Sequence, residues 1–264
     1  MRSGSGFPLA LRGFVALVYV FLIGPIAIII ATSFSPTQSS AFPPVGFSLR
    51  WYGEFLRSAN FTSAFRFSLG LGLGVAAIAT AIGFITAYAA RRLVGRHGGA
   101  VQSVAMLPLL VPHILISISL LLALNFVPVP DVQVLVAGHV LICLPFTVSG
   151  ITASLDGVDA QLESAAMTLG ASRLAAMREV VLPLVAPGIL SAFLFAFIVS
   201  FGDVYIALFL TGPGTTTLPI EIFSFIEWES SPVIAAISTV QILLIVGLGL
   251  VIERLVGLRR LMRV

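Results

Sequence analysis

The sequence predicts an all-α integral membrane protein with six transmembrane helices and one long cytosolic loop. Hydrophobic residues make up 58% of its 264 residues, charged residues make up 9%, and the mean hydropathy is +1.11. A soluble domain has roughly 25% charged residues, so a soluble fold of this chain would lack a polar surface. Six apolar runs of about 20 residues recur along the chain, and each could cross a hydrocarbon layer about 30 Å thick.

The six spans are expected within a single transmembrane domain over residues 1–264, at about 14–34, 67–90, 101–127, 132–153, 187–210 and 233–252. The first run exceeds the 7–15-residue apolar core of a signal peptide, and no convincing cleavage pattern follows it, so we expect an uncleaved helix. In the second span, Gly70 and Gly74 share a face and indicate close helix packing. In the third span, Pro108 and Pro112 predict a kink.

Arginine predicts the orientation, because the chain has 14 arginines and no lysine. If the N-terminus is cytoplasmic, eleven arginines lie on the inner side and three on the outer side. The positive-inside bias then places both termini and the loop at 154–186 in the cytoplasm. The basic composition therefore reflects topology and does not indicate nucleic acid binding. The inner set is Arg2, Arg12, Arg91, Arg92, Arg96, Arg173, Arg178, Arg254, Arg259, Arg260 and Arg263, and the outer set is Arg50, Arg57 and Arg66.

The loop at 154–186 is polar and predicts two short helices joined at a glycine. Asp156, with Asp159 three residues later, is typical of a helix N-cap with an acidic third position. The first helix then runs through Glu163 to Leu169, and Gly170 provides the left-handed residue that ends it.

The second loop helix is expected to begin after Ser172, which is a favourable N-cap residue. Pro183 and Pro187 are expected to prevent this helix from merging smoothly with the fifth span. The loop would then be a helix, a tight corner and a second helix that leads into the membrane. Such a rigid, polar device in an apolar protein indicates a contact with a soluble partner.

The fifth span contains Asp203, the only acidic residue within any of the six predicted spans. On a helical wheel, an aromatic stripe faces away from a face of small residues that includes Ser200 and Asp203. An ionised carboxylate facing lipid would cost several kcal/mol, so Asp203 should face the bundle interior or a watery cavity. The stripe comprises Phe193, Phe197, Phe201, Tyr205 and Phe209, and the small face comprises Ala192, Ala196, Ser200, Asp203 and Ala207.

Two interpretations of Asp203 stay open from the sequence. It could line a translocation path, with Ser200 and Tyr205, and favour a cationic solute. It could instead be a helix-end carboxylate bonded to nearby backbone. His113 and His139 are interpreted as hydrogen-bonded core residues rather than proton carriers.

The loop resembles the coupling loop of permease subunits in bacterial type I ABC importers, the MetI-like superfamily. The shared pattern is Glu-x-Ala-Ala, then a glycine, then Leu-Pro, although Ser164 stands where the family usually has alanine. The resemblance extends over nearly the whole chain and is strongest to the second permease of spermidine/putrescine-type systems. It rests on Glu163, Ala165, Ala166, Gly170 and Leu182-Pro183, with Ser48 to Tyr52, Leu107-Pro108, Pro112, His139, Leu144 to Phe146, Ser200 to Asp203 and Thr217 to Pro219.

The resemblance implies an ATP-driven importer subunit in the bacterial inner membrane. Its implied partners are two cytosolic ATPase subunits, a second homologous permease in a heterodimer, and an extracytoplasmic solute-binding protein. Glu163, Ala165, Ala166, Gly170, Leu182 and Pro183 would then be the ATPase-coupling residues. Putrescine or spermidine is the implied cargo, and another small solute such as an aminophosphonate is the alternative.

The residues themselves give no indication of an enzyme. A Gly-Lys-Ser/Thr nucleotide loop is absent, and the three histidines have no spacing suited to a metal or a nucleophile. We therefore expect no cofactor on this chain, with ATP and magnesium bound by the ATPase. Two other classes stay open: a self-contained channel or secondary carrier, and a membrane-embedded enzyme. The first would transport without ATP, and the second would need a polar cluster at one depth.

Overall fold

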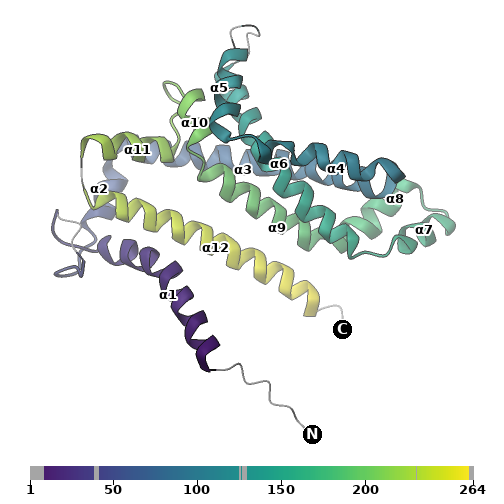
Figure 1. Cartoon of the computed structure of the whole chain (residues 1–264), viewed down its shortest axis with the longest axis horizontal. Helices are drawn as coiled ribbons and strands as arrows, with labels where there is room; N and C mark the ends of the chain where they lie inside the picture. The colour runs from purple at the N-terminus through teal and green to yellow at the C-terminus, as the bar shows by residue number, and fades with distance from the viewer. Residues whose placement is uncertain (1–8, 39–41, 125, 127–129, 230, 262–264) are drawn as a thin grey trace. The chain divides into compact units, whose positions relative to one another are not determined.

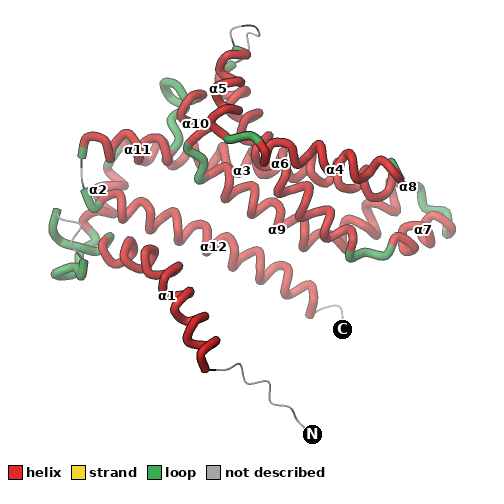
Figure 2. The backbone as a smooth tube through the Cα atoms, viewed as in Figure 1, coloured by secondary structure: helices red, strands yellow, loops and turns green. Residues whose placement is uncertain are grey.

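The computed structural model describes residues 9–38, 42–124, 126, 130–229 and 231–261, and its elements in these ranges are all helical (Figure 1, Figure 2). The predicted all-α fold is confirmed. Arg2, Arg263 and the predicted end of the third span at Val127 lie outside the described residues. The elements are α1 (Leu9–Thr32), α2 (Arg50–Arg57), α3 (Ala59–Tyr88), η1 (Ala89–Leu93), η2 (Gly95–His97), α4 (Gly98–Met106), η3 (Leu107–Leu110), α5 (His113–Ala123), α6 (Asp131–Asp156), α7 (Ala160–Thr168), α8 (Arg173–Ala176), η4 (Met177–Val181), α9 (Leu182–Phe201), α10 (Tyr205–Leu210), α11 (Leu218–Trp228) and α12 (Val233–Leu261).

Within the described part of the chain, five helices are long and apolar enough to cross a membrane. A sixth span results if the bent pair Gly95–Leu110 and His113–Ala123 is counted as one. The number of spans then agrees with the prediction from the six apolar runs.

The second span differs from the sequence prediction at its start, and the third span is interrupted where its prolines lie. The helix of the second span, α3, begins at Ala59 rather than near 67. Ser58 caps it there, and a helix needs no apolar residues where it extends beyond the membrane. The kink predicted in the third span is confirmed, and it is a break with a bend of 93°. Pro112 causes this break, since the residue before a proline favours an extended backbone, and Val111 has φ −105° and ψ 125°.

Pro183 and Pro187 were expected to prevent the second loop helix from merging smoothly with the fifth span. The two helices join without a break, but they do so through an irregular π-helical turn. One continuous helix runs from Arg173 to Phe201. The segment Met177–Val181 is π-helical, and the Leu182 N–H donates to the Met177 carbonyl five residues back. This wider turn accommodates Pro183, which lacks an N–H and would crowd the preceding turn of a regular helix.

The chain divides into two compact units, the first formed by residues 1–62 and 225–246 and the second by residues 63–224 and 247–264. The single domain expected from the sequence stays a prediction. In the first unit, the segment after α1 is fixed by aromatic residues of α2. The buried Trp51 indole donates to the Ser35 carbonyl at 2.7 Å, and the Tyr52 and Ser33 hydroxyls are 2.7 Å apart.

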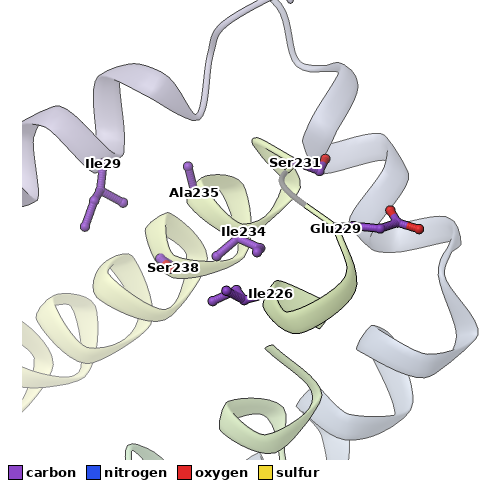
Figure 3. A pocket seen from close by; sticks show the side chains of 7 residues that line it. All are labelled: Ile29, Ile226, Glu229, Ser231, Ile234, Ala235 and Ser238. Carbon is purple, nitrogen blue, oxygen red and sulfur yellow. The ribbon is translucent and has the colours of Figure 1, made fainter. Parts of the chain in front are cut away.

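The first unit also holds an open pocket of about 320 Å³ between α1, α11 and α12 (Figure 3). Its lining is largely apolar, and among the described residues that line it Glu229 is the charged one. The other lining residues are Ile29, Ile226, Ser231, Ile234, Ala235 and Ser238.

The core of the second unit forms where α6 and α9 pack along each other (Figure 1). Small residues allow this close approach, as expected for helices in a membrane, where packing rather than apolar burial drives association. Cys143 is fully buried there, with its thiol donating to the Ala196 carbonyl at 3.3 Å. One end of this interface also receives Tyr88 and packs around Ile151, Leu155, Val181 and Val185.

Gly188→Ala is expected to loosen the α6–α9 interface. A Cβ at Gly188 would lie 2.4 Å from the Ser154 Cβ, so one of the helices must shift. Overpacking of this kind costs about 1–3 kcal/mol, and thermal unfolding in detergent should show a lower Tm. Gly150→Ala on the facing helix is the control, because its Cβ would meet Ala192 at an ordinary 3.6 Å. Equal Tm values for the two variants would contradict this account.

Candidate functional site

The first candidate site is the corner formed by α7 and α8. Asp159 caps α7, since its carboxylate accepts from the Gln161 N–H at 2.9 Å. The sequence prediction of a cap at Asp156 is therefore corrected by three residues. Asp156 instead belongs to the last turn of α6, which continues further than expected.

The corner itself agrees with the local sequence pattern. Gly170 has φ +97°, a left-handed conformation that L side chains rarely adopt, and it follows the end of α7. Ser172 caps α8 by accepting from the Ala175 N–H at 3.2 Å. Two short helices thus meet at a fixed angle set by one glycine and one serine.

Glu163 lies on the inward side of α7 and is buried. Its Oε1 accepts a hydrogen bond from the Tyr88 hydroxyl at 2.5 Å. Its Oε2 lies 3.6 Å from the Arg92 Nε. The carboxylate therefore faces the end of α3 and η1, and the opposite side of α7 faces away from these elements.

The remaining predicted coupling residues lie mostly at the surface. Ala165, Gly170, Leu182 and Pro183 are exposed, and Ala166 is half-buried. Three large apolar side chains next to them are also exposed, namely Leu162 at 48%, Leu169 at 90% and Leu174 at 60%. The corner thus exposes three leucines, which we together call the leucine surface.

The second candidate site is a break between α9 and α10. The helix stops at Phe201, and after Gly202 to Val204 the chain resumes as α10. Asp203 is buried in this break, and its Oδ2 accepts from the Ile206 N–H at 2.7 Å and the Ala207 N–H at 3.4 Å. The carboxylate therefore caps α10, which is the helix-end arrangement considered from the sequence.

Two histidines approach the same carboxylate. His113 Nδ1 lies 3.7 Å from Asp203 Oδ1, and His139 Nε2 lies 4.0 Å from Asp203 Oδ2. His139 is fully buried, and its Nδ1 forms a hydrogen bond of 2.9 Å with the Ser200 hydroxyl. The prediction of a hydrogen-bonded core residue is confirmed for His139, and the structure brings Ser200 and Asp203 together around it.

Tyr205 and the aromatic stripe are not arranged as predicted. Because the helix breaks at Gly202, the stripe ends at Phe201 and does not continue into α10. Phe197 and Phe201 are buried with their rings stacked at 5.2 Å, whereas Tyr205 is 54% exposed. A straight helical wheel is only valid along one uninterrupted helix.

From the sequence, Arg91 and Arg92 were expected only to be inner-side charges, and no role was predicted for Tyr88. In the structure, all three residues contact the segment around the start of α7. Tyr88 donates to Glu163, Arg91 to Asp156, and Arg92 to the Val158 carbonyl. A signal was available, because two adjacent arginines at the end of an apolar span need counter-charges. Asp156 and Glu163 are acidic residues that the orientation prediction placed on the same side of the membrane.

Comparison with known proteins identifies relatives over most of the chain. Residues 79–258 match the family of binding-protein-dependent transport system inner membrane components. The spermidine/putrescine transport system permease protein PotC of Escherichia coli is 33% identical over 91% of this chain and 90% of the relative. The putrescine transport system permease protein PotI of Escherichia coli is 35% identical over 84% and 82%. The putative 2-aminoethylphosphonate transport system permease protein PhnV of Salmonella typhimurium is 29% identical over 90% and 91%.

Solved structures share the fold. A chain of a bacterial ABC transporter involved in the import of alginate matches with a TM-score of 0.72, at 16% identity over 96% of this chain and 98% of that chain. A chain of the alginate transporter in complex with an alginate pentasaccharide-bound periplasmic protein matches with a TM-score of 0.68, at 14% identity over 93% and 91%. With the family match and the relatives above, the chain belongs to the inner membrane components of binding-protein-dependent transport systems.

Proposed function

We propose that this permease subunit carries a polyamine, putrescine or spermidine, across the bacterial inner membrane at the expense of ATP hydrolysed elsewhere. The observation that supports ATP coupling is the α7–Gly170–α8 corner, a rigid helical device that exposes three leucines. The polyamine assignment is supported by two relatives, whose names specify spermidine/putrescine and putrescine and which are 33% and 35% identical. The aminophosphonate relative, at 29% identity, supports the alternative cargo.

In this proposal, the leucine surface of α7 and α8 binds a cytosolic ATPase subunit. Apolar side chains that are exposed to water in the isolated chain gain free energy when a partner covers them. Glu163, Ala165, Ala166, Gly170, Leu182 and Pro183 then contribute to coupling in two ways. Exposed members of this set adjoin the bound partner, whereas the buried Glu163 holds α7 in its orientation.

The complete importer would contain two ATPase subunits, this chain, a second homologous permease and an extracytoplasmic solute-binding protein. ATP and magnesium would bind the ATPase subunits, and this chain would have no catalytic role. Both termini would be cytoplasmic, since the excess of arginine on that side favours this orientation.

We place the translocation path, as part of the same proposal, along the break between α9 and α10. Broken helices commonly border transport paths, because their free backbone groups and half-helix ends are available to a polar solute. Tyr205 is exposed beside the break, and Ser200 and Asp203 lie behind it in a polar cluster. A carboxylate at this position suits a cationic polyamine.

Leu169→Glu is expected to weaken ATPase binding by at least about tenfold. Covering a leucine stabilises a complex by about 1.5–3 kcal/mol, and each 1.4 kcal/mol is a factor of ten. The measurement is the ratio of ATPase to permease after co-purification from cells that express the whole importer. Val45→Glu is the matched control, since Val45 is 84% exposed in a segment predicted to be outside. Equal ratios for both variants would contradict binding at the leucine surface.

The cargo is tested with vesicles containing the whole importer and its solute-binding protein. Labelled putrescine should accumulate only with ATP, and unlabelled spermidine should compete whereas 2-aminoethylphosphonate should not. Competition by the aminophosphonate alone would establish the alternative cargo. Uptake by the purified chain without any ATPase would establish a self-contained channel or carrier and overturn the proposal.

A further inference from the structure

Side chains from the end of α3 and from η1 hold the start of α7. Tyr88, the last residue of α3, donates its hydroxyl hydrogen to Glu163 Oε1. Arg92 places its Nε 3.6 Å from Glu163 Oε2, and its Nη2 donates to the Val158 carbonyl at 2.8 Å. We call Tyr88, Arg92 and Glu163 the α3–α7 clamp.

The neighbouring arginine, Arg91, binds the end of α6, the helix that precedes α7. Arg91 forms a two-point ion pair with Asp156, with Nε–Oδ1 at 2.8 Å and Nη2–Oδ2 at 2.9 Å. Adjacent residues of a helix normally point in directions about 100° apart. Here both lie in the π-helical turn Ala89–Leu93, and their guanidinium groups reach the end of α6 and the start of α7.

Burial makes the clamp a connection that a partner cannot easily replace. The side chains of Arg92 and Glu163 are 14% and 8% exposed. Arg92 Nε and Glu163 Oε2 are buried 3.6 Å apart, and neither atom has a hydrogen-bond partner among the described residues. Removing one member of a buried charge pair is strongly destabilising, because the other charge stays buried and uncompensated.

The clamp also gives α7 a second connection to a membrane-spanning helix. Along the chain, α7 leads through α8 and η4 into α9. Through the clamp, the same helix is fastened to α3, which is 75 residues earlier in the case of Tyr88 and Glu163. A displacement of α7 by a partner is then applied to two membrane-spanning helices at once.

We propose that the α3–α7 clamp makes α7 and the adjoining end of α3 move as one body, so that Glu163 acts as a positioning residue that transmits partner motion to α3. This inference rests on the proposed ATPase coupling. The leucine surface binds the partner, and the clamp converts that binding into movement of a membrane helix. In the isolated chain, the Glu163 carboxylate contacts Tyr88 and Arg92.

The test uses Tyr88→Phe, Glu163→Gln and the double variant in the complete importer. Each single change removes part of the clamp with little change of volume. Uptake is expected to fall about tenfold in Glu163→Gln, as loss of a buried charge-assisted contact predicts, and less in Tyr88→Phe. The amount of co-purified ATPase should stay unchanged, so that ATP hydrolysed per solute molecule rises. Because both changes break one connection, the double variant should be no worse than Glu163→Gln alone.

Glu179→Gln is the control, since Glu179 is an exposed carboxylate of the nearby η4 turn. A charge-swapped pair, Arg92→Glu with Glu163→Arg, should recover part of the lost uptake. Three results would overturn the inference: loss of the ATPase from Glu163→Gln, unchanged uptake in that variant, or multiplied effects in the double variant. Failure of the proposed function is a separate result, in which the unmodified importer shows no bound ATPase and no ATP-dependent uptake.

Discussion

Asp203→Ala should destabilise the second unit and abolish most uptake. The change removes the side-chain cap of α10 and leaves the buried Ile206 N–H without its acceptor at 2.7 Å. Loss of a cap costs about 0.5–2 kcal/mol, and an unsatisfied buried donor costs about 1–3 kcal/mol. The two costs describe largely the same lost acceptor, so we expect about 1–3 kcal/mol in total. It also removes the carboxylate nearest to His113 and His139. Thermal unfolding in detergent and polyamine uptake measure the two effects.

Asp203→Asn keeps a side-chain oxygen that can cap α10 but removes the negative charge. An asparagine oxygen caps a helix about as well as aspartate does, so the Tm should stay near that of the unmodified chain. If the carboxylate attracts a cationic solute, uptake should still fall and the apparent affinity should weaken. Uptake and affinity equal to those of the unmodified importer would limit Asp203 to its structural role and end the path assignment.

Gly170→Ala should reduce uptake by about tenfold while leaving the rest of the fold intact. The backbone at Gly170 has φ +97°, and an L residue in a left-handed conformation costs about 1–2 kcal/mol. A Cβ there would meet no atom within 4 Å, so backbone strain is the only direct effect. To relieve it, the chain must change the angle between α7 and α8, which displaces the leucine surface. Gly170→Val should be more severe, because β-branched residues are rarer still at positive φ.

Gly157→Ala is the matched control for the corner. Gly157 lies in the same loop, but its φ is −81°, and a Cβ there would lie 3.5 Å from the Ser154 carbonyl. Alanine fits this conformation, so uptake and co-purified ATPase should be unchanged. If Gly157→Ala and Gly170→Ala impair uptake equally, the left-handed corner has no special role in coupling.

Local chemistry explains which parts of the site could be read from the sequence. Gly170 and Ser172 were identified correctly, because a helix stop and an N-cap depend on a few neighbouring residues. The cap of α7 was placed three residues early, at Asp156, since either aspartate could begin a helix. The choice between them depends on how far α6 continues before the loop.

The merging of the loop helix with α9 was not predicted, because proline rules assume a regular helix. A π-helical turn before Pro183 removes the conflict that those rules describe. The motif likewise could not predict that the Glu163 side chain is buried. The motif specifies a residue type and a spacing, whereas its direction depends on Tyr88 and Arg92.

The sequence by itself determined that the chain is helical and membrane-spanning, how many apolar runs it has, and where its polar corner turns. These features follow from hydrophobic length and from residues close together in the chain. Only the tertiary structure decided that Glu163 faces α3 and that Ser200 meets His139, which is 61 residues away. Such contacts are selected by helix packing, because a polar group buried among helices must find its partner wherever the fold brings one near.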